Sequence, residues 1–505
     1  MRRSPFLAFA LLLCAHGAWS AEKPAEWHTF HHDSARSGLS PVRMDTPPFA
    51  RAWTFDLGDH TWKYCQGASV WSSCAVGASI DDAMRVFIGC YDHNIYCLDA
   101  ETGKEIWRFT TGCLVKAAPA FAWIDGVPML FVASSDRCFY GLDARTGRKL
   151  WNFETYAWTY TVGESLAGAP LLARVNGKLV LYATMWNSDR RPLRTRRAGE
   201  LFAFDPATGK LLLRTVVSEG HLTPPSFLDV DGKPMIFIGG EDGVMRGIDA
   251  VTGEQVWKFI GDHRVDAAPL LTRIGGQPVL FLTNAWGMVR CLSAASGRSI
   301  WRYKAGHESL STPALFKTTD KYVLVFGASD RCVHAVEAKS GELMWKFQTG
   351  KYVISSPAVA VVGDRPVVFA NSLDNNLYLL DGEEGHEIMR FASGDMLWPF
   401  ETRGMSIWSS PSIIGRADGR ALVLYPGHDG KLYALTQREP GQTATASDAT
   451  ATGWHPEQET PARHSSRPPA GPFVRTVPPL VGLSLLLAAL GIVFAPRRSA
   501  GTVSR

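Results

Sequence analysis

The sequence predicts an all-β fold, an eight-bladed β-propeller built from four-stranded antiparallel blades. The first observation behind this prediction is a stretch that repeats along the chain, beginning with LDAETGKEIWRF at residues 98–109. Every step between its turn glycines is 44 residues except one of 62. These glycines are Gly103, Gly147, Gly209, Gly253, Gly297, Gly341 and Gly385. Repetition at such a period is typical of propellers, solenoids and arrays.

The second observation is the content of one repeat. Residues 265–303 contain four apolar runs, APLLTRI, PVLFLT, MVRCLSA and SIWRY, separated by the turn signals GG, NAWG and SG. Short β-branched and aromatic runs joined by such turns predict four strands linked by hairpins. No stretch of the repeats has a 3.6-residue apolar period, which argues against helices. Four strands in about 44 residues are typical of a propeller blade.

The third observation is a tryptophan four residues after most of the turn glycines. The glycine permits a left-handed turn between the third and fourth strands. The tryptophan then lies on the outermost strand, where it can cover the joint with a neighbouring blade, and a backbone carbonyl of that blade's turn would suit its N–H. Leu213 and Met389 take this place in two copies, as expected for a packing role. The expected blade-docking residues are Trp53, Trp107, Trp151, Trp257, Trp301 and Trp345.

The ring is expected to close by joining the two ends of the repeat region. An eighth unit begins at residues 409–414 and ends at Thr436 without its last strand. Residues 51–58, RAWTFDLG, match the missing strand. We therefore expect the N-terminal strand to complete the last blade, which leaves no open edge, and the propeller to span residues 27–436.

These repeats resemble the PQQ-binding-like propeller repeats of quinoprotein dehydrogenases. They resemble equally the propeller lipoprotein of the outer-membrane β-barrel assembly machinery. The lead-in segment at residues 27–41, with Trp27, Phe30, Asp33, Arg36 and Gly38, is also similar to the segment that precedes such propellers. The resemblance covers about four-fifths of the chain and implies the fold, but the family contains both enzymes and scaffolds.

The two ends of the chain predict export and attachment. Residues 1–20 have the basic start, apolar run and small-residue exit of a signal peptide. Residues 437–476 are rich in Pro, Thr, Ala and Ser, as in a disordered linker. The apolar residues 477–494 would span ~27 Å as a transmembrane helix. Arg497 and Arg498 in the tail, residues 495–505, place that tail in the cytoplasm. The expected location is a periplasmic domain anchored in the inner membrane; the alternative is a sorting signal that is removed.

Charge and cysteine content narrow the function further. A formal net charge of +4 on 505 residues is too small to indicate a nucleic-acid partner. Export permits disulfides. Cys90 and Cys97 flank one hairpin turn and are candidates for a disulfide, as are Cys65 and Cys74. The sequence has no C-x-x-C pair that would indicate zinc or covalent haem, so no metal site is predicted.

Four insertions interrupt the 44-residue rhythm. Three join the last strand of one blade to the first strand of the next, and the fourth, residues 186–200, separates two strands of blade 3. In a propeller both kinds of connection open on one face, and long loops on a rigid scaffold commonly bind ligands. We expect a partner-binding face there; the alternative is that its aromatics cap the disc and its arginines are only solvated. The residues are Trp62, Tyr156, Trp158, Glu164, Trp186, Arg190, Arg191, Arg194, Trp398 and Arg403.

Two functions follow from these features. The favoured one is a non-catalytic scaffold that binds an envelope protein or polymer, for which no catalytic residue is assigned. The alternative is a membrane-bound quinoprotein dehydrogenase, which the resemblance implies would stack PQQ on an indole and hold calcium through carboxylate and amide oxygens. The resemblance implies that many of these dehydrogenases cover the cofactor with a disulfide between adjacent cysteines. No two cysteines are adjacent in this sequence, which argues against the alcohol-oxidising type. Candidate parts for the alternative are Asn284, Trp286, Glu164, Asp395 and Arg403.

Overall fold

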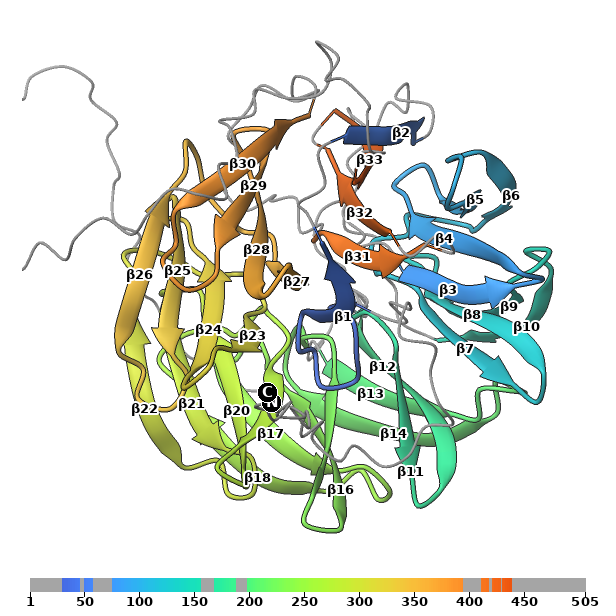
Figure 1. The fold of residues 1–505 in the computed structure, drawn as a ribbon. Helices are drawn as coiled ribbons and strands as arrows, with labels where there is room; N and C mark the ends of the chain where they lie inside the picture. The colour runs from blue at the N-terminus through green and yellow to red at the C-terminus, as the bar shows by residue number, and fades with distance from the viewer. Residues whose placement is uncertain are drawn as a thin grey trace, which may run out of the picture. The chain divides into compact units, whose positions relative to one another are not determined.

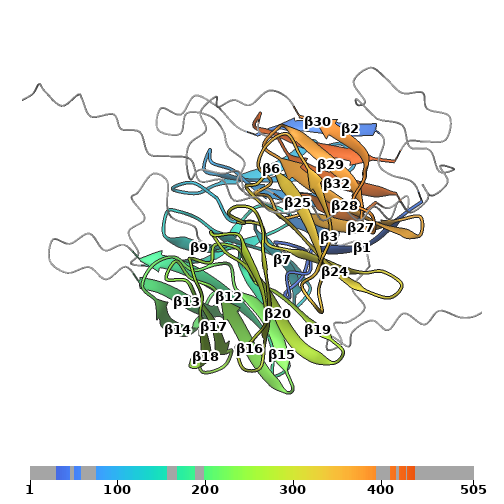
Figure 2. The same cartoon turned by 90° about the vertical axis from the view of Figure 1, so that its left-hand side faces the viewer.

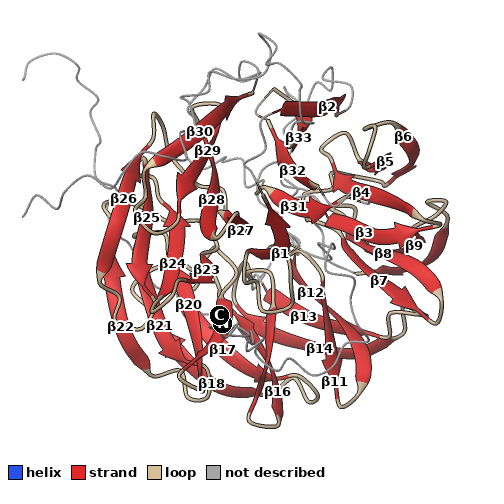
Figure 3. Ribbon diagram, viewed as in Figure 1, coloured by secondary structure: helices blue, strands red, loops and turns tan. Residues whose placement is uncertain are grey.

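The structure is a computed structural model that describes residues 30–45, 50–57, 75–155, 168–187, 198–393, 410–416, 420–427 and 429–437. All regular elements in this part of the chain are β-strands, and they form eight sheets around a central axis (Figure 1, Figure 3). The predicted all-β propeller of eight antiparallel blades is confirmed. A helix suited to crossing a membrane does not occur among the described residues.

Blades 1 to 4 follow one another along the chain, each with its first strand nearest the axis. Blade 1 contains β3 (Ala75–Ile80), β4 (Ala83–Gly89), β5 (Asn94–Asp99) and β6 (Glu105–Thr110). Blade 2 contains β7 (Ala120–Ile124), β8 (Val127–Ala133), β9 (Cys138–Asp143) and β10 (Lys149–Glu154). Blade 3 contains β11 (Leu171–Val175), β12 (Lys178–Asn187), β13 (Ala198–Phe204) and β14 (Leu211–Ser218). Blade 4 contains β15 (Ser226–Val230), β16 (Lys233–Ile238), β17 (Val244–Asp249) and β18 (Gln255–Ile260).

Blades 5 to 8 continue the ring. Blade 5 contains β19 (Leu270–Ile274), β20 (Gln277–Thr283), β21 (Met288–Ser293) and β22 (Ser299–Lys304). Blade 6 contains β23 (Ala314–Lys317), β24 (Tyr322–Gly327), β25 (Cys332–Glu337) and β26 (Leu343–Gln348). Blade 7 contains β27 (Ala358–Val362), β28 (Arg365–Ser372), β29 (Asn376–Asp381) and β30 (Glu387–Ala392). Blade 8 contains β31 (Ser412–Gly415), β32 (Ala421–Pro426), β33 (Lys431–Thr436) and, from the other end of the chain, β2 (Ala50–Asp56).

The last blade closes the ring as the sequence predicts. Strand β2 pairs antiparallel with β33, with Trp53 opposite Ala434 and Phe55 opposite Leu432. The two ends of the repeat region are thus held together by a ladder of backbone hydrogen bonds. A strand that the sequence analysis missed, β1 (Leu39–Met44), runs parallel to β27 and gives blade 7 a fifth strand at the axis (Figure 1).

The hydrophobic core is divided into layers between neighbouring blades. Strand side chains alternate between the two faces of each sheet, so one strand contributes to two layers. In blade 1, for example, Val86 and Ile88 pack toward blade 8, whereas Phe87 and Ile95 pack toward blade 2. Figure 2 shows neighbouring sheets lying side by side.

The tryptophans of the outermost strands lie in the joints between blades. The indole N–H of Trp53 donates to the carbonyl of Ala100 in the next blade at 2.8 Å, and that of Trp345 donates to Gly382 at 2.9 Å. The turn glycine of the next blade lies under each ring, and a Cβ atom at Gly103 would be 2.5 Å from the Trp53 ring. The glycine is needed both for its positive φ of 69° and for this close approach. Trp107, Trp151, Trp257 and Trp301 make the equivalent bond to Ala144, Pro206, Ala294 and Ala338.

The two joints without a tryptophan have local explanations. In blade 3, Leu213 packs against the turn glycine Gly253, and the hydroxyl of Tyr182 donates to the carbonyl of Ala250 at 2.7 Å. Tyr182 thereby satisfies the acceptor that an indole satisfies elsewhere. In blade 7, Met389 faces blade 8, whose third and fourth strands come from opposite ends of the chain. That blade has no turn between them to offer a carbonyl.

The proposed Cys90–Cys97 disulfide is wrong. Both cysteines are free and buried. Cys97 lies opposite Phe87 in the β4–β5 ladder, and it packs toward blade 2, whereas Cys90 packs toward blade 8. The two thiols therefore point to opposite faces of one sheet. Cys65 and Cys74 lie outside the described residues.

Candidate functional site

The two kinds of long connection share one face of the propeller. The crossing from blade 4 to blade 5 donates from Val265 N to Gly240 O in the turn between β16 and β17. The corresponding turn of blade 5 donates from Ala285 N back to Arg264 O in the same crossing. The described crossings and turns are thus hydrogen-bonded to each other around the ring, so these two kinds of connection lie on the same face.

The predicted partner-binding residues lie almost entirely beyond the described part of the chain. Trp186 is in β12, where its backbone pairs with Gly199. The remaining positions of the predicted binding face lie outside the described residues and stay predictions, as does Asp395. The positions of that face are Trp62, Tyr156, Trp158, Glu164, Arg190, Arg191, Arg194, Trp398 and Arg403.

The axis at this face is filled by the chain's own lead-in segment, residues 31–38. The carbonyls of Ser34, Ala35, Ser37 and Gly38 accept hydrogen bonds of 2.9 to 3.0 Å from successive inner strands. The donors are Phe227 in blade 4, Leu271 in blade 5, Leu315 in blade 6 and Val359 in blade 7. We call this segment the axial plug. It leads directly into β1, which lies in the middle of the ring in Figure 1.

Arg36 anchors the axial plug. Its side chain is fully buried, and the guanidinium donates to the carbonyls of Phe30, Ala169 and Pro225, which spreads the positive charge over three backbone dipoles. Burial lowers the pKa of Arg36 to about 9, and the charge of Asp33 opposes this shift. Arg36, one of the lead-in residues named by the sequence analysis, therefore joins blades 3 and 4 to the axis.

His31 ties the axial plug to the other side of the ring. Its ring nitrogens lie 2.8 Å from the carbonyl oxygen of Arg36 and 2.9 Å from that of Pro357, just before β27. Burial lowers the pKa of His31 to about 4, although the two carbonyls oppose the shift. The neutral ring donates to one of these oxygens.

Small residues surround the plug where the inner strands begin. Two positions before the proline that precedes each inner strand of blades 2 to 7, the residues are Ala117, Gly168, Thr223, Ala267, Ser311 and Ser355. Hydroxyls connect adjacent blades here: Ser356 Oγ accepts from Thr312 N at 2.9 Å, and Ser410 Oγ accepts from Ser356 N at 3.1 Å.

Two of the residues named for the quinoprotein alternative, Asn284 and Trp286, lie in the described turn between β20 and β21. Asn284 is buried, and its Oδ1 accepts from Trp286 N and Met288 N within its own turn, so that oxygen supports the turn. Trp286 is exposed and stacks on His263 with ring centroids 5.1 Å apart. Asn284 and Trp286 therefore act locally.

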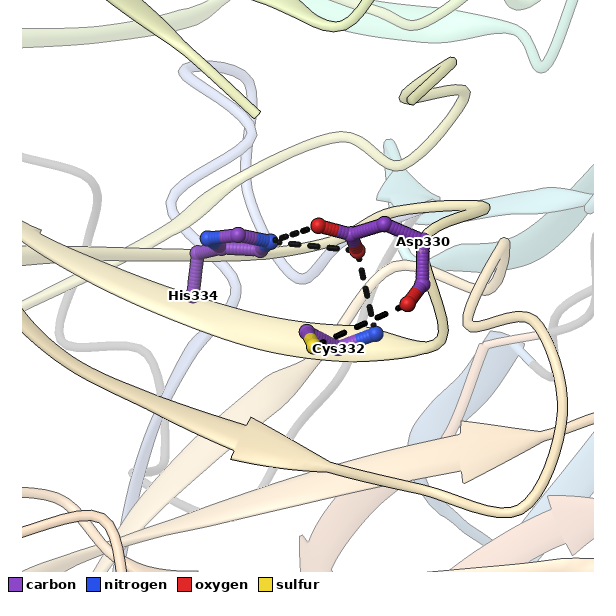
Figure 4. A group of neighbouring side chains, drawn as sticks. All are labelled: Asp330, Cys332 and His334. Carbon is purple, nitrogen blue, oxygen red and sulfur yellow. Dashed lines mark hydrogen bonds and ion pairs between the residues drawn. The ribbon is translucent and has the colours of Figure 1, made fainter. Parts of the chain in front are cut away.

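A cluster with metal-ligating side chains lies in blade 6. Asp330, Cys332 and His334 place a carboxylate oxygen, Sγ and an imidazole nitrogen all within 4.8 Å of one another (Figure 4). His334 Nε2 is 3.0 Å from an Asp330 oxygen, and the Cys332 amide donates to the same carboxylate at 3.1 Å. His334 and Cys332 are both buried.

The same position in other blades identifies this cluster as a structural turn. In blade 2 the Tyr140 hydroxyl donates to Asp136 at 2.6 Å, and in blade 7 Tyr378 donates to Asp374 at 2.7 Å. Each aspartate begins the turn into the third strand, and its partner follows four residues later. Blades 1, 4 and 8 contain the corresponding pairs Asp92–Tyr96, Asp242–Arg246 and Asp429–Tyr433. We call this arrangement the aspartate latch.

His334 is the blade 6 version of the aspartate latch. The hydroxyl of Tyr303, on the outermost strand of blade 5, lies 3.0 Å from His334 Nδ1, and His334 Nε2 lies 3.0 Å from an Asp330 oxygen. A neutral ring with its proton on Nε2 donates to Asp330 and accepts from Tyr303. Burial lowers the pKa of His334, and Asp330 opposes that shift. Cys332 has its counterpart in Cys138 of blade 2, which sits in a latch closed by tyrosine. The group is therefore explained by packing.

A separate charged group lies in the crossings into blades 5 and 6. Arg264 is 3.0 Å from Asp266 and 3.4 Å from Glu308. Burial raises the pKa of Asp266 to about 6, while Arg264 opposes the shift. This carboxyl can change its protonation state near neutral pH, on the face that carries the long loops.

Fold and repeats together define the class: an eight-bladed propeller of PQQ-like repeats whose axis is filled by its own N-terminal segment. A family model described as outer membrane protein assembly factor BamB matches residues 50–236, 157–283 and 285–453. The chain belongs to this family. A search of curated protein sequences finds no match.

Solved structures share the fold at low sequence identity. A quinohemoprotein alcohol dehydrogenase from Comamonas testosteroni is similar with a TM-score of 0.61 and 14% identity, over 84% of this chain and 83% of that one. A europium-containing methanol dehydrogenase has a TM-score of 0.61 and 13% identity, over 82% and 98%. BamB from Moraxella catarrhalis has a TM-score of 0.48 and 16% identity, over 77% of this chain and 99% of that one. These similarities establish the fold and leave the activity open.

Proposed function

We propose that this chain is an exported, membrane-anchored and non-catalytic scaffold that binds an envelope protein or polymer through its long-loop face. The observation that supports the proposal is the construction of the axis at the long-loop face. The axial plug is hydrogen-bonded there to the inner strands of successive blades, which suits a rigid structural disc. The signal peptide of residues 1–20 and the apolar residues 477–494 supply export and attachment.

The arrangement of the described polar groups supports the same proposal. The aspartate latches and the buried serines of the axis bind neighbouring parts of the propeller. A rigid disc with variable loops on one face is a suitable scaffold for protein recognition. The matched family is described as an outer membrane protein assembly factor.

The first prediction tests the scaffold against the quinoprotein alternative. Titration of the purified full chain with PQQ and Ca²⁺ should give no saturable quinone absorbance and no dye reduction with alcohols or sugars. Tight PQQ binding with turnover would contradict the proposal. A positive test is crosslinking in the cell envelope: replacing Arg190, Arg191 and Arg194 with glutamate should remove the crosslinked partner. Replacing the exposed Arg108, Arg302 and Lys346 of the outermost strands with glutamate is the matched control and should retain it.

A further inference from the structure

The aspartate latch of blade 6 differs from the other latches in the chemistry of its side chains. Asp330, Cys332 and His334 occupy alternate positions of one short stretch, and Figure 4 shows the imidazole facing the carboxylate. Packing accounts for the conformation of this turn. A carboxylate, a thiol and an imidazole within 4.8 Å of one another are also a set of metal ligands, and no second such group occurs in the part of the chain that the structure describes. We call these three residues the blade 6 cluster.

Blade 2 offers a close comparison because its turn has almost the same sequence. Residues 135–138 and 329–332 both read SDRC, and in each turn the cysteine amide donates to the aspartate, at 3.0 and 3.1 Å respectively. The two latches differ two residues later, where blade 2 has Tyr140 and blade 6 has His334. Histidine is the commonest metal ligand in proteins, whereas a neutral phenol is a poor one. One side chain thus distinguishes a hydrogen-bonded turn from a candidate metal site.

The outermost strand of the preceding blade changes together with the latch residue. Where blades 1, 2 and 7 have tyrosine in the latch, that strand packs a phenylalanine ring against it. The pairs are Phe55–Tyr96, Phe109–Tyr140 and Phe347–Tyr378. Beside His334 the same position is Tyr303, whose hydroxyl lies 3.0 Å from Nδ1. A metal-binding histidine almost always hydrogen-bonds through its other ring nitrogen, which orients the ring, and Tyr303 supplies this contact.

Backbone groups hold the carboxylate in place. The amides of Gly306 and Cys332 donate to the two different oxygens of Asp330, each at 3.1 Å. A carboxylate oxygen that accepts one hydrogen bond still has a lone pair for a metal ion. The imidazole and the carboxylate of the blade 6 cluster are therefore both oriented by neighbouring groups, as the ligands of metal sites are.

A fourth oxygen and the local charge also suit a divalent cation. Gln348 lies opposite Cys332 in the β25–β26 ladder; its Oε1 is 3.4 Å from Sγ, and its Nε2 donates to the carbonyl of Arg331 at 3.3 Å. Asp330 and a Cys332 thiolate together carry two negative charges. The positive charges of Arg331 and Lys346 act on this group, but both side chains are exposed, so water and salt screen them.

We propose that the blade 6 cluster binds a zinc ion through a carboxylate oxygen of Asp330, Sγ of Cys332 and Nε2 of His334. Thiolate and imidazole ligands favour zinc over calcium and magnesium, which prefer oxygen ligands. Ligand atoms on one tetrahedral zinc ion lie about 3.3–3.7 Å apart. Atoms that already lie within 4.8 Å of one another therefore need only small side-chain movements.

The protons of the cluster are redistributed when the ion binds. The Cys332 thiol releases its proton to solvent as the metal–sulfur bond forms. The imidazole proton moves from Nε2 to Nδ1, which then donates to the hydroxyl of Tyr303. The bound ion fixes the turn that precedes β25, and the proposal does not depend on the function proposed above.

The test uses the purified full chain, reduced and freed of metal by a chelator. Titration with Co²⁺, a spectroscopic substitute for zinc, should give a saturable thiolate-to-cobalt charge-transfer band, and Zn²⁺ should displace the Co²⁺. Cys332→Ser should remove the band. Cys138→Ser makes the same change in the matching turn of blade 2 and should leave the band unchanged.

A second loss variant preserves the latch. Tyr303→Phe/His334→Tyr gives blade 6 the phenylalanine–tyrosine pair of blades 1, 2 and 7, so it should fold but lose the band. Zn²⁺ should raise the melting temperature of the wild type and of Cys138→Ser, but not that of this double variant. Tyr303→Phe alone keeps all three ligands and should weaken Co²⁺ binding by about 10–100-fold.

Transfer of the site to blade 2 completes the test. Phe109→Tyr/Tyr140→His reproduces the blade 6 cluster around Asp136 and Cys138, and it should raise the cobalt stoichiometry by one ion per chain. The proposal is overturned if the wild type gives no charge-transfer band, if the band persists in Cys332→Ser or in Tyr303→Phe/His334→Tyr, or if Cys138→Ser loses it equally. An unchanged stoichiometry in the folded blade 2 variant would also count against it.

Discussion

Single side chains hold this propeller together through bonds between blades. Each indole N–H at a joint finds a carbonyl in the next blade, and a buried carbonyl without a donor costs about 1–3 kcal/mol. At the joint where Leu213 replaces the tryptophan, the buried carbonyl still has a hydrogen-bond donor, although a different residue supplies it. The Ala250 carbonyl is retained there, and the Tyr182 hydroxyl, from a different strand, donates to it at 2.7 Å.

This substitution of donors predicts a rescue between two residues. Tyr182→Phe should lower the free energy of unfolding by about 1–3 kcal/mol, because it leaves the Ala250 carbonyl buried without a donor. Adding Leu213→Trp should recover most of that loss, since the other joints show that an indole over a turn glycine reaches this carbonyl. Urea unfolding of the two single variants and the double variant measures the coupling. Strictly additive effects would contradict this account.

At the scale of elements, regular and irregular segments were predictable to different degrees. The hairpins followed from turn residues such as Asp125–Gly126, whose φ angles of 47° and 80° fit a tight type I′ turn. Strand β1 and the axial plug were missed because residues 31–44 occur once and include Pro41, so no period exposes them. The aspartate latch was missed because its second member changes from tyrosine to arginine at Arg246 and histidine at His334. The Cys90–Cys97 pairing failed because nearness to a turn does not fix the face of a side chain.

The axial plug predicts a pH dependence of stability. His31 has a pKa of about 4 in the folded chain, below its ordinary value, because burial disfavours the charged ring; the charge of Arg36 lowers the pKa further, while the two carbonyls and Asp33 oppose the shift. The unfolded chain therefore binds the proton more tightly, and folding loses stability as the pH falls from about 6.5 to 4. The difference between the wild type and His31→Gln should change by up to about 3 kcal/mol across this range. Urea unfolding at a series of pH values measures it, and a wild type that gains stability over His31→Gln on acidification would contradict the assignment.

At the scale of the whole molecule, the closing blade differs from the others because no turn joins its two outermost strands, β33 and β2. Six blades have all their strands in one run of chain, and blade 7 adds only β1 beside β27, whereas in blade 8 the paired strands β2 and β33 come from opposite ends of the repeat region. The period revealed this arrangement in the sequence because Trp53, Phe55 and Gly58 match the strand that the eighth unit lacks.

The closing strand predicts where the ring opens first. Trp53→Ala removes the indole between blades 8 and 1, and Trp257→Ala removes the equivalent one between blades 4 and 5. Each should cost about 3–5 kcal/mol of unfolding free energy. Only Trp53→Ala should also speed hydrogen exchange of the amides in β2 and β33 relative to the inner strands, because no covalent turn keeps these two strands paired once the joint is weakened. Native-state exchange followed by mass spectrometry compares the variants. Equal acceleration at β2 in both would mean that the closing pair is no weaker than a continuous hairpin, and that the ring unfolds as one cooperative unit.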